Sequence, residues 1–158
     1  FENLNKNIKI EKVIAGGSVA NSMAGIAYLG GSTSFIGKVN SDQFGNLYKK
    51  SLDEVNVKFS YKKKNESLST GASIILITPD SERTMCTYLG VSSHLTADDI
   101  DEKNILDHEL IFLEGYLWDK GISEKMFKHT INLAKKNKVK IAMSLSDIFC
   151  VTRHKNDF

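Results

Sequence analysis

The sequence predicts an α/β fold with a mainly parallel sheet, flanked by helices and interrupted by a β-hairpin. Helix-like and strand-like segments alternate in the first part of the chain, as in α/β proteins. In the middle, two strand-like segments are separated only by residues 79–82, which is the spacing of a hairpin. Residues 110–113 then form a short, continuous apolar run, typical of a buried parallel strand.

The elements before the hairpin follow from capping residues and periodicity. Ser18 can cap a helix that runs to about Leu29. Residues 33–39 are rich in β-formers and are expected to form a strand. Asn40 or Ser41 can cap the next helix, on whose face four residues recur at helical spacing, namely Phe44, Leu47, Tyr48 and Leu52.

The hairpin and the elements after it complete the pattern. Residues 70–78 and 83–89 are the two hairpin strands. Thr96, with Asp99 three residues on, predicts a capping box at the start of a short helix. Residues 123–137 are expected to form a helix that places Phe127, Thr130, Ile131 and Ala134 inward, and residues 141–145 the strand after it.

Composition and charge narrow the classes of partner. Of the 158 residues, 41% are hydrophobic and 25% are charged, as in an ordinary globular domain. The net charge of +2 is too small to indicate binding to nucleic acid or to an anionic membrane. No apolar run approaches the ~20 residues of a membrane span. The two cysteines form no disulfide framework, and neither they nor the four histidines have metal-ligand spacing, so we expect a cytoplasmic protein without a metal site in this chain.

Residues 15–21 read A-G-G-S-V-A-N and are the most informative part of the chain. Gly16 and Gly17 allow close approach of a ligand to the backbone, and the helix that follows offers unpaired N–H groups to oxygen atoms. Asn21 falls in the first turn of that helix and carries one acceptor and two donors, which suits a vicinal diol. On the local pattern alone, an ordinary tight turn remains open. A dinucleotide site fits poorly, because the two glycines are adjacent and the third is missing.

Six blocks of sequence, taken together, resemble one enzyme family. They resemble the PfkB-type carbohydrate kinases, which include ribokinases, fructokinases and adenosine kinases, and most closely the bacterial adenosine-kinase-like branch. The blocks are G-G-S-V-A-N-S at 16–22, F-I-G-K-V-N-S-D-Q-F-G at 35–45, T-G-A-S-I-I-L-I-T at 70–78, E-R-T-M-C-T-Y-L-G at 82–90, F-L-E-G-Y-L-W-D at 112–119 and M-S-L-S-D-I-F-C at 143–150.

This resemblance implies a ribokinase-like fold, that is, a Rossmann-type, mainly parallel sheet flanked by helices, with a β-hairpin lid at about residues 70–90. The family's second signature, Gly-Ala-Gly-Asp, supplies the catalytic base and does not occur in these 158 residues. The family's first strand, with an early substrate-binding aspartate, is expected before Phe1. We therefore expect residues 1–158 to be a partial kinase domain, incomplete at both ends, that keeps the substrate-binding side.

The implied activity is ATP-dependent phosphorylation of the primary hydroxyl of a sugar or nucleoside, adenosine or a ribose-like sugar. ATP and Mg²⁺ are implied as cofactors bound mostly outside this chain, so no catalytic residue and no metal ligand are expected within it. A ribokinase- or fructokinase-type sugar kinase and a non-catalytic sugar- or nucleoside-binding fragment are the alternatives. Some relatives use the lid strands for dimer contacts, so a homodimer through the lid is also open.

The resemblance also implies substrate-binding residues. Gly16 and Gly17 would bring backbone to the sugar, and Asn21 would hydrogen-bond two of its hydroxyls. Tyr116 and Phe149 follow buried strands, at the sheet edge where α/β folds bind ligands, and would hold the base or sugar. For Phe149, a ring in the core is the competing interpretation.

The hairpin supplies the remaining candidates. Met85, Thr87 and Leu89 alternate along one strand and therefore point to one face. Ser73 on the partner strand would join them if the register allows. By the resemblance this face covers the nucleobase, and an ordinary sheet face packed on the core is the alternative.

Overall fold

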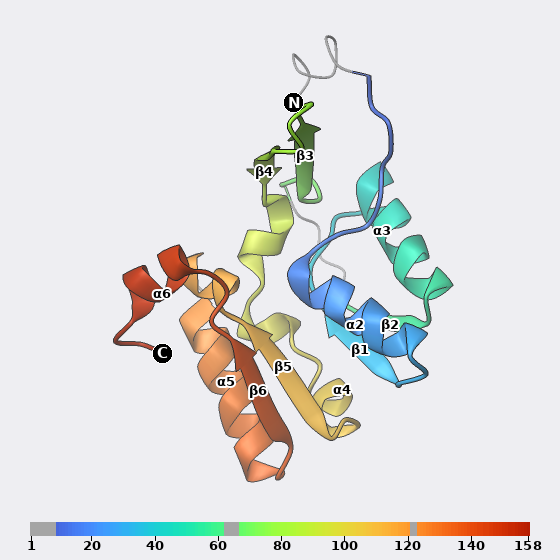
Figure 1. Ribbon diagram of the computed structural model, residues 1–158. Helices are drawn as coiled ribbons and strands as arrows, with labels where there is room; N and C mark the ends of the chain where they lie inside the picture. Colours follow the sequence, from blue (N-terminus) through green and yellow to red (C-terminus); the bar gives the residue numbers. More distant parts are fainter. Residues whose placement is uncertain (1–8, 62–66, 121–122) are drawn as a thin grey trace.

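The computed structural model describes residues 9–61, 67–120 and 123–158, which contain three separate pairs of strands (Figure 1). Strand β1 (Thr33–Ile36) pairs in parallel with β2 (Val57–Ser60), and β5 (Leu110–Glu114) pairs in parallel with β6 (Lys140–Ser144). The third pair is the antiparallel hairpin of β3 (Ala72–Ile77) and β4 (Arg83–Tyr88). Two of the three pairs are thus parallel and helices flank them, as the sequence predicts.

Helices α2 (Ser18–Tyr28) and α3 (Gln43–Glu54) pack on the β1–β2 pair and form one core with it. The side chains of Ala20, Leu52 and Val57 are buried at its centre. Helix α2 ends where Gly30 takes a φ of 88°, a left-handed conformation that glycine adopts without strain.

Asp42 begins α3 and also ties this helix to the start of the hairpin. Its carboxylate accepts hydrogen bonds from the Gly45 amide at 2.8 Å, and from the amide and hydroxyl of Thr70, both at 2.7 Å. Burial of the carboxyl raises the pKa of Asp42, but the hydrogen bonds from Thr70 and Gly45 together outweigh it and leave the pKa below its ordinary value.

The second core lies around the β5–β6 pair. Helix α5 (Ser123–Lys136) covers these strands, and the 3₁₀ turns η1 (Gly90–His94) and η2 (Ala97–Asp99) and the short helix α4 (Glu102–Leu106) lead into them from the hairpin (Figure 1). Its buried side chains include Leu95, Ile100, Ile105, Leu113, Met126 and Phe127. After β5 the chain forms the 3₁₀ turn η3 (Gly115–Lys120), and after β6 it forms helix α6 (Ile148–His154).

A buried ion pair joins the segment after β1 to the 3₁₀ turn η2. The Nζ of Lys38 lies 3.2 Å from Oδ2 of Asp99, and both side chains are almost fully buried. Asp99 also closes the capping box with Thr96 that the sequence predicts, although a 3₁₀ turn rather than an α-helix follows it. Within the described residues, no helix is long and apolar enough to cross a lipid bilayer.

Several boundaries differ from those expected from the sequence. Strand β1 ends at Ile36 rather than at residue 39, and Lys38 and Val39 just beyond its end are buried. The cap of α3 is Asp42 rather than Asn40 or Ser41, and the cap of α2 is Gly17, which has no side chain to donate or accept a bond. Phe44 and Leu47 are exposed among the described residues, although their spacing predicts an inward face.

Candidate functional site

The turn before α2 is held in a conformation that requires glycine. Gly17 has a φ of 114° and a ψ of 134°, and its carbonyl accepts the first helical hydrogen bond from the Asn21 amide at 2.8 Å. A side chain at Gly17 would therefore be strained. At Gly16 a Cβ would meet nothing within 4 Å, so the backbone of this residue borders open space. We call residues 16 and 17 the glycine turn.

Asn21 lies in the first turn of α2, directly beyond the glycine turn, and its side chain is exposed. Within the described part of the chain, the side-chain amide of Asn21 makes no hydrogen bond. Asn21 therefore offers one acceptor and two donors beside the free N–H groups at the helix start.

A buried carboxylate connects this helix start to the carboxyl ends of the two parallel strands β5 and β6. Glu114, the last residue of β5, is 9% exposed and accepts a hydrogen bond from the Ser18 hydroxyl at 2.8 Å. Its other oxygen accepts a hydrogen bond from the hydroxyl of Ser146, in the segment after β6. The next residue, Gly115, has no room for a side chain. A Cβ there would lie 3.0 Å from the Ser146 hydroxyl and 3.1 Å from two backbone oxygens. Three segments distant in sequence thus meet at Glu114.

Tyr116 and Phe149 lie just beyond this junction. The Tyr116 hydroxyl donates to Oδ2 of Asp147 at 3.2 Å, and Asp147 in turn caps α6 by accepting from the Cys150 amide. Desolvation, together with the charge of Asp147, raises the pKa of Tyr116. The ring of Phe149 is 68% exposed, so the alternative of a core ring does not hold within the described residues.

The register of the hairpin places Ser73 directly opposite Thr87, and their hydroxyl oxygens lie 2.9 Å apart. Met85 is on the same face and is 61% exposed, so this face is not packed on a core in the described structure. The hydrogen bonds described here do not join this face to the glycine turn or to Asn21.

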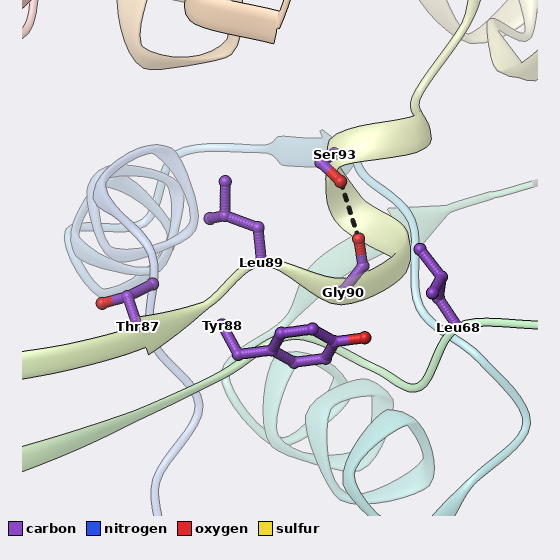
Figure 2. Close-up of a pocket in the computed structure, with 6 residues that line it drawn as sticks. All are labelled: Leu68, Thr87, Tyr88, Leu89, Gly90 and Ser93. Carbon is purple, nitrogen blue, oxygen red and sulfur yellow. Dashed lines mark hydrogen bonds between the residues drawn. The ribbon is translucent and has the colours of Figure 1, made fainter.

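A pocket of about 300 Å³ lies at the base of the hairpin (Figure 2). Of the predicted site residues, it brings together Thr87 and Leu89. The side chains of Leu89 and Tyr88 point to opposite sides of the chain there, and the Ser93 hydroxyl donates to the Gly90 carbonyl at 2.8 Å. The full lining is Leu68, Thr87, Tyr88, Leu89, Gly90 and Ser93.

The polar groups around the glycine turn are an amide, hydroxyls and backbone N–H groups, a donor set that fits hydroxyl groups of a ligand. In the described ranges, no group of three or more His, Cys, Asp or Glu side chains is placed to hold a metal ion.

The chain matches, over residues 1–153, the family described as pfkB family carbohydrate kinase.

The chain belongs to the pfkB family. A 5-dehydro-2-deoxygluconokinase of Clostridium beijerinckii is 34% identical over 131 residues, which cover 80% of this chain and 38% of that protein. A probable fructokinase-6, chloroplastic, of Arabidopsis thaliana is 36% identical over 100 residues, which cover 63% of this chain and 25% of that protein.

Solved structures of this family confirm the ribokinase-like fold. The crystal structure of an adenosine kinase from Sinorhizobium meliloti matches with a TM-score of 0.90 and 33% identity, over 99% of this chain and 48% of that one. A probable sugar kinase from Rhizobium etli matches with a TM-score of 0.89 and 32% identity, over the same shares. The pfkB chain described here therefore spans about half the length, or less, of these relatives.

Glu114, one residue of the candidate site, was not predicted from the sequence. Glu114 is the last residue of an otherwise apolar strand, L-I-F-L-E, and a carboxylate that ends a buried strand needs hydrogen-bond donors. That position signals a polar junction, but its partners Ser18 and Ser146 lie 96 and 32 residues away in sequence. Only the fold reveals that they meet.

Proposed function

We propose that the protein containing this chain is an ATP-dependent kinase that phosphorylates the primary hydroxyl of a sugar or nucleoside. The observation that carries the proposal is the open glycine turn with Asn21 beside it, anchored through Ser18 to Glu114 at the carboxyl ends of the parallel strands. Membership of the pfkB family and the sugar and nucleoside kinases among its relatives support it.

In this proposal Gly16, Gly17 and Asn21 hold the substrate diol. A vicinal diol presents two oxygens that each donate and accept, and the Asn21 amide can serve both functions at once. The glycine backbone permits close approach, and the N–H groups at the start of α2 point toward oxygen atoms. These contacts orient the sugar, and orientation is a main source of rate enhancement in phosphoryl transfer.

We further propose that the substrate is a nucleoside rather than a free sugar. Tyr116 and Phe149 offer aromatic rings next to the Glu114 junction, and the hairpin offers Ser73, Met85, Thr87 and Leu89 as a covering face. A purine would bury a broad apolar surface against such side chains, whereas a free pentose would leave them exposed. Closure of the hairpin would exclude water, so that phosphate is transferred to the sugar and not to water.

ATP would supply the transferred phosphoryl group, with Mg²⁺ as its counter-ion, and we place both mostly outside this chain. The base for the substrate hydroxyl would come from the Gly-Ala-Gly-Asp signature of the family, also outside it. The side chains described here would bind and orient the substrate and exclude water. An enzyme that draws on cellular ATP would work in the cytoplasm. A homodimer through the hairpin is a further proposal, because within the described residues β3 and β4 each have an unpaired outer edge.

The test is a substrate panel with the full-length protein, ATP and Mg²⁺. Adenosine, ribose, fructose and 5-dehydro-2-deoxygluconate are compared by the rate of ADP release at matched concentrations. We expect the highest kcat/KM with adenosine. A higher value with one of the three sugars would assign the protein to the sugar kinases and overturn the nucleoside proposal. Binding without turnover of any of the four would favour a non-catalytic binding protein.

A further inference from the structure

A tyrosine from α3 reaches the glycine turn. The Tyr48 hydroxyl donates a hydrogen bond to the Gly16 carbonyl at 3.2 Å, across 32 residues of sequence. We propose that Tyr48 is a positioning residue, which fixes the glycine turn so that the Gly17 N–H is directed at a hydroxyl oxygen of the substrate. This inference deepens the proposed function and rests on it.

The Tyr48 ring is itself held in place by neighbouring rings. It packs edge-on against Phe59, with ring centroids 5.7 Å apart and planes at 70°, and its centroid lies 6.3 Å from that of Phe35. Both phenylalanines come from the β1–β2 pair, next to the buried core of Ala20, Leu52 and Val57. The ring therefore has little freedom, and its hydroxyl emerges at one defined place.

The glycine turn needs such a contact because its own residues do not restrict it. Glycine has more backbone freedom than any other residue, and ordering it has the largest entropic cost. A Cβ at Gly16 would have no neighbour within 4 Å, so packing does not fix this residue either. The carbonyl that Tyr48 holds is thus a main restraint on the orientation of the turn.

Holding that carbonyl also sets the direction of a donor. The Gly16–Gly17 peptide is planar and trans, so the Gly16 C=O and the Gly17 N–H point in opposite directions. With the carbonyl held toward α3, the Gly17 N–H is directed away from α3. Gly17 is the cap residue of α2, and its N–H therefore has no acceptor within the helix.

The Tyr48 hydroxyl remains a donor under ordinary conditions. Burial raises the pKa of Tyr48 to about 12, so the group stays protonated throughout the neutral range. The contact with Gly16 is accordingly insensitive to pH where a kinase is assayed.

The test is Tyr48→Phe in the full-length protein, which removes one oxygen and keeps the ring. One hydrogen bond corresponds to a change of roughly two- to tenfold in an equilibrium constant, so we expect KM for the sugar or nucleoside to rise by about that factor, with kcat within about twofold. We also expect faster hydrogen exchange at the backbone amide of Asn21, which donates to the Gly17 carbonyl and is therefore protected only while the turn is held.

Two controls separate positioning from stability. Tyr28→Phe removes the same atom from a side chain on α2 that is 91% exposed, and neither KM nor exchange should change. Leu52→Val weakens the core beneath Tyr48, and it should lower the melting temperature without raising KM. An unchanged KM in an active Tyr48→Phe protein, or unchanged exchange at the turn, would overturn the inference. A wild-type protein that phosphorylates no substrate would instead overturn the proposed function, and the exchange measurement would still decide whether Tyr48 fixes the turn.

Discussion

At the scale of single residues, Asn21 can be substituted with little expected effect on the stability of the fold. Its side chain is exposed and makes no hydrogen bond to another described residue, so the folded state does not depend on its amide. Residues with this combination are more informative about ligands than buried ones, whose substitution also disturbs packing.

We expect Asn21→Ala in the full-length protein to lower kcat/KM by about 5- to 150-fold, the effect of losing roughly 1–3 kcal/mol of hydrogen bonds to a diol. The melting temperature should stay within a degree or two. Steady-state kinetics and a melting curve on the same preparation measure both. Asn132→Ala, an exposed position on α5, is the matched control and should change neither. An unchanged kcat/KM would remove Asn21 from the site.

Glu114, in contrast to Asn21, is expected to contribute to the stability of the fold. Its carboxylate is buried and accepts hydroxyl hydrogen bonds on both oxygens, which a glutamine cannot reproduce because its NH₂ group only donates. We expect Glu114→Gln to cost roughly 1–3 kcal/mol of unfolding free energy, measured by urea denaturation. Glu124→Gln, on the exposed side of α5, should cost less than about 0.5 kcal/mol. Equal effects of the two substitutions would argue against a structural junction at Glu114.

At the scale of elements, Asp42 couples α3 to the hairpin. Its pKa is lowered in the folded state, so the ionised form stabilises the fold at pH values above the ordinary pKa of about 4. This contribution is lost as the pH falls through the lowered pKa. We expect Asp42→Asn to be less stable than wild type at neutral pH and the difference to shrink below about pH 4.

Melting temperatures of wild type and Asp42→Asn across an acid pH series measure this dependence. Asp101→Asn is a useful control, because Asp101 also caps a helix but, among the described residues, accepts a hydrogen bond from the Lys103 amide alone. Its loss of stability at neutral pH should be smaller than that of Asp42→Asn, because one hydrogen bond is weakened instead of three. A constant difference between wild type and Asp42→Asn at all pH values would mean that the charge of Asp42 is not what stabilises the contact.

Local patterns in the sequence predicted most helices and strands to within a few residues and missed two short ones. Helices α2 and α5 match the expected ranges within one residue, because their apolar spacing and glycine or polar boundaries are local signals. Strand β2 and helix α6 were not predicted. Four residues of strand and seven of helix carry too little periodicity, and they are ordered by packing against distant segments.

The candidate site divides along the same line. The glycine turn, Asn21 and the hairpin register depend on residues close in sequence, and the pattern alone could indicate them. Glu114 and Tyr48 act through hydrogen bonds that span 96 and 32 residues, and no local pattern encodes those. The resemblance to the pfkB kinases rests on separate blocks of sequence, and it does not indicate which residues of these blocks contact one another.

At the scale of the whole molecule, the described residues leave much apolar surface uncovered. Within the described residues each of the three sheets has two strands, so each sheet has an outer edge on both sides that can pair with further strands. Large apolar side chains are exposed in addition, among them Tyr28 and Leu29 at the end of α2 and Ile148 and Phe149 in α6. Residues 1–158 expressed alone should therefore associate or aggregate, as size-exclusion chromatography would show.

The same 158 residues should also show no kinase activity on their own. Phosphoryl transfer needs a base for the substrate hydroxyl and groups that neutralise the transferring phosphate. The Gly-Ala-Gly-Asp signature is absent from the sequence, and Glu114, the buried carboxylate beside the glycine turn, already accepts two hydroxyl hydrogen bonds. ATP consumption by the purified chain, with Mg²⁺ and adenosine, measures this directly, and the full-length protein is the positive control. Turnover that follows the 158-residue chain through purification would contradict the prediction, because it would require a base for the hydroxyl within these residues.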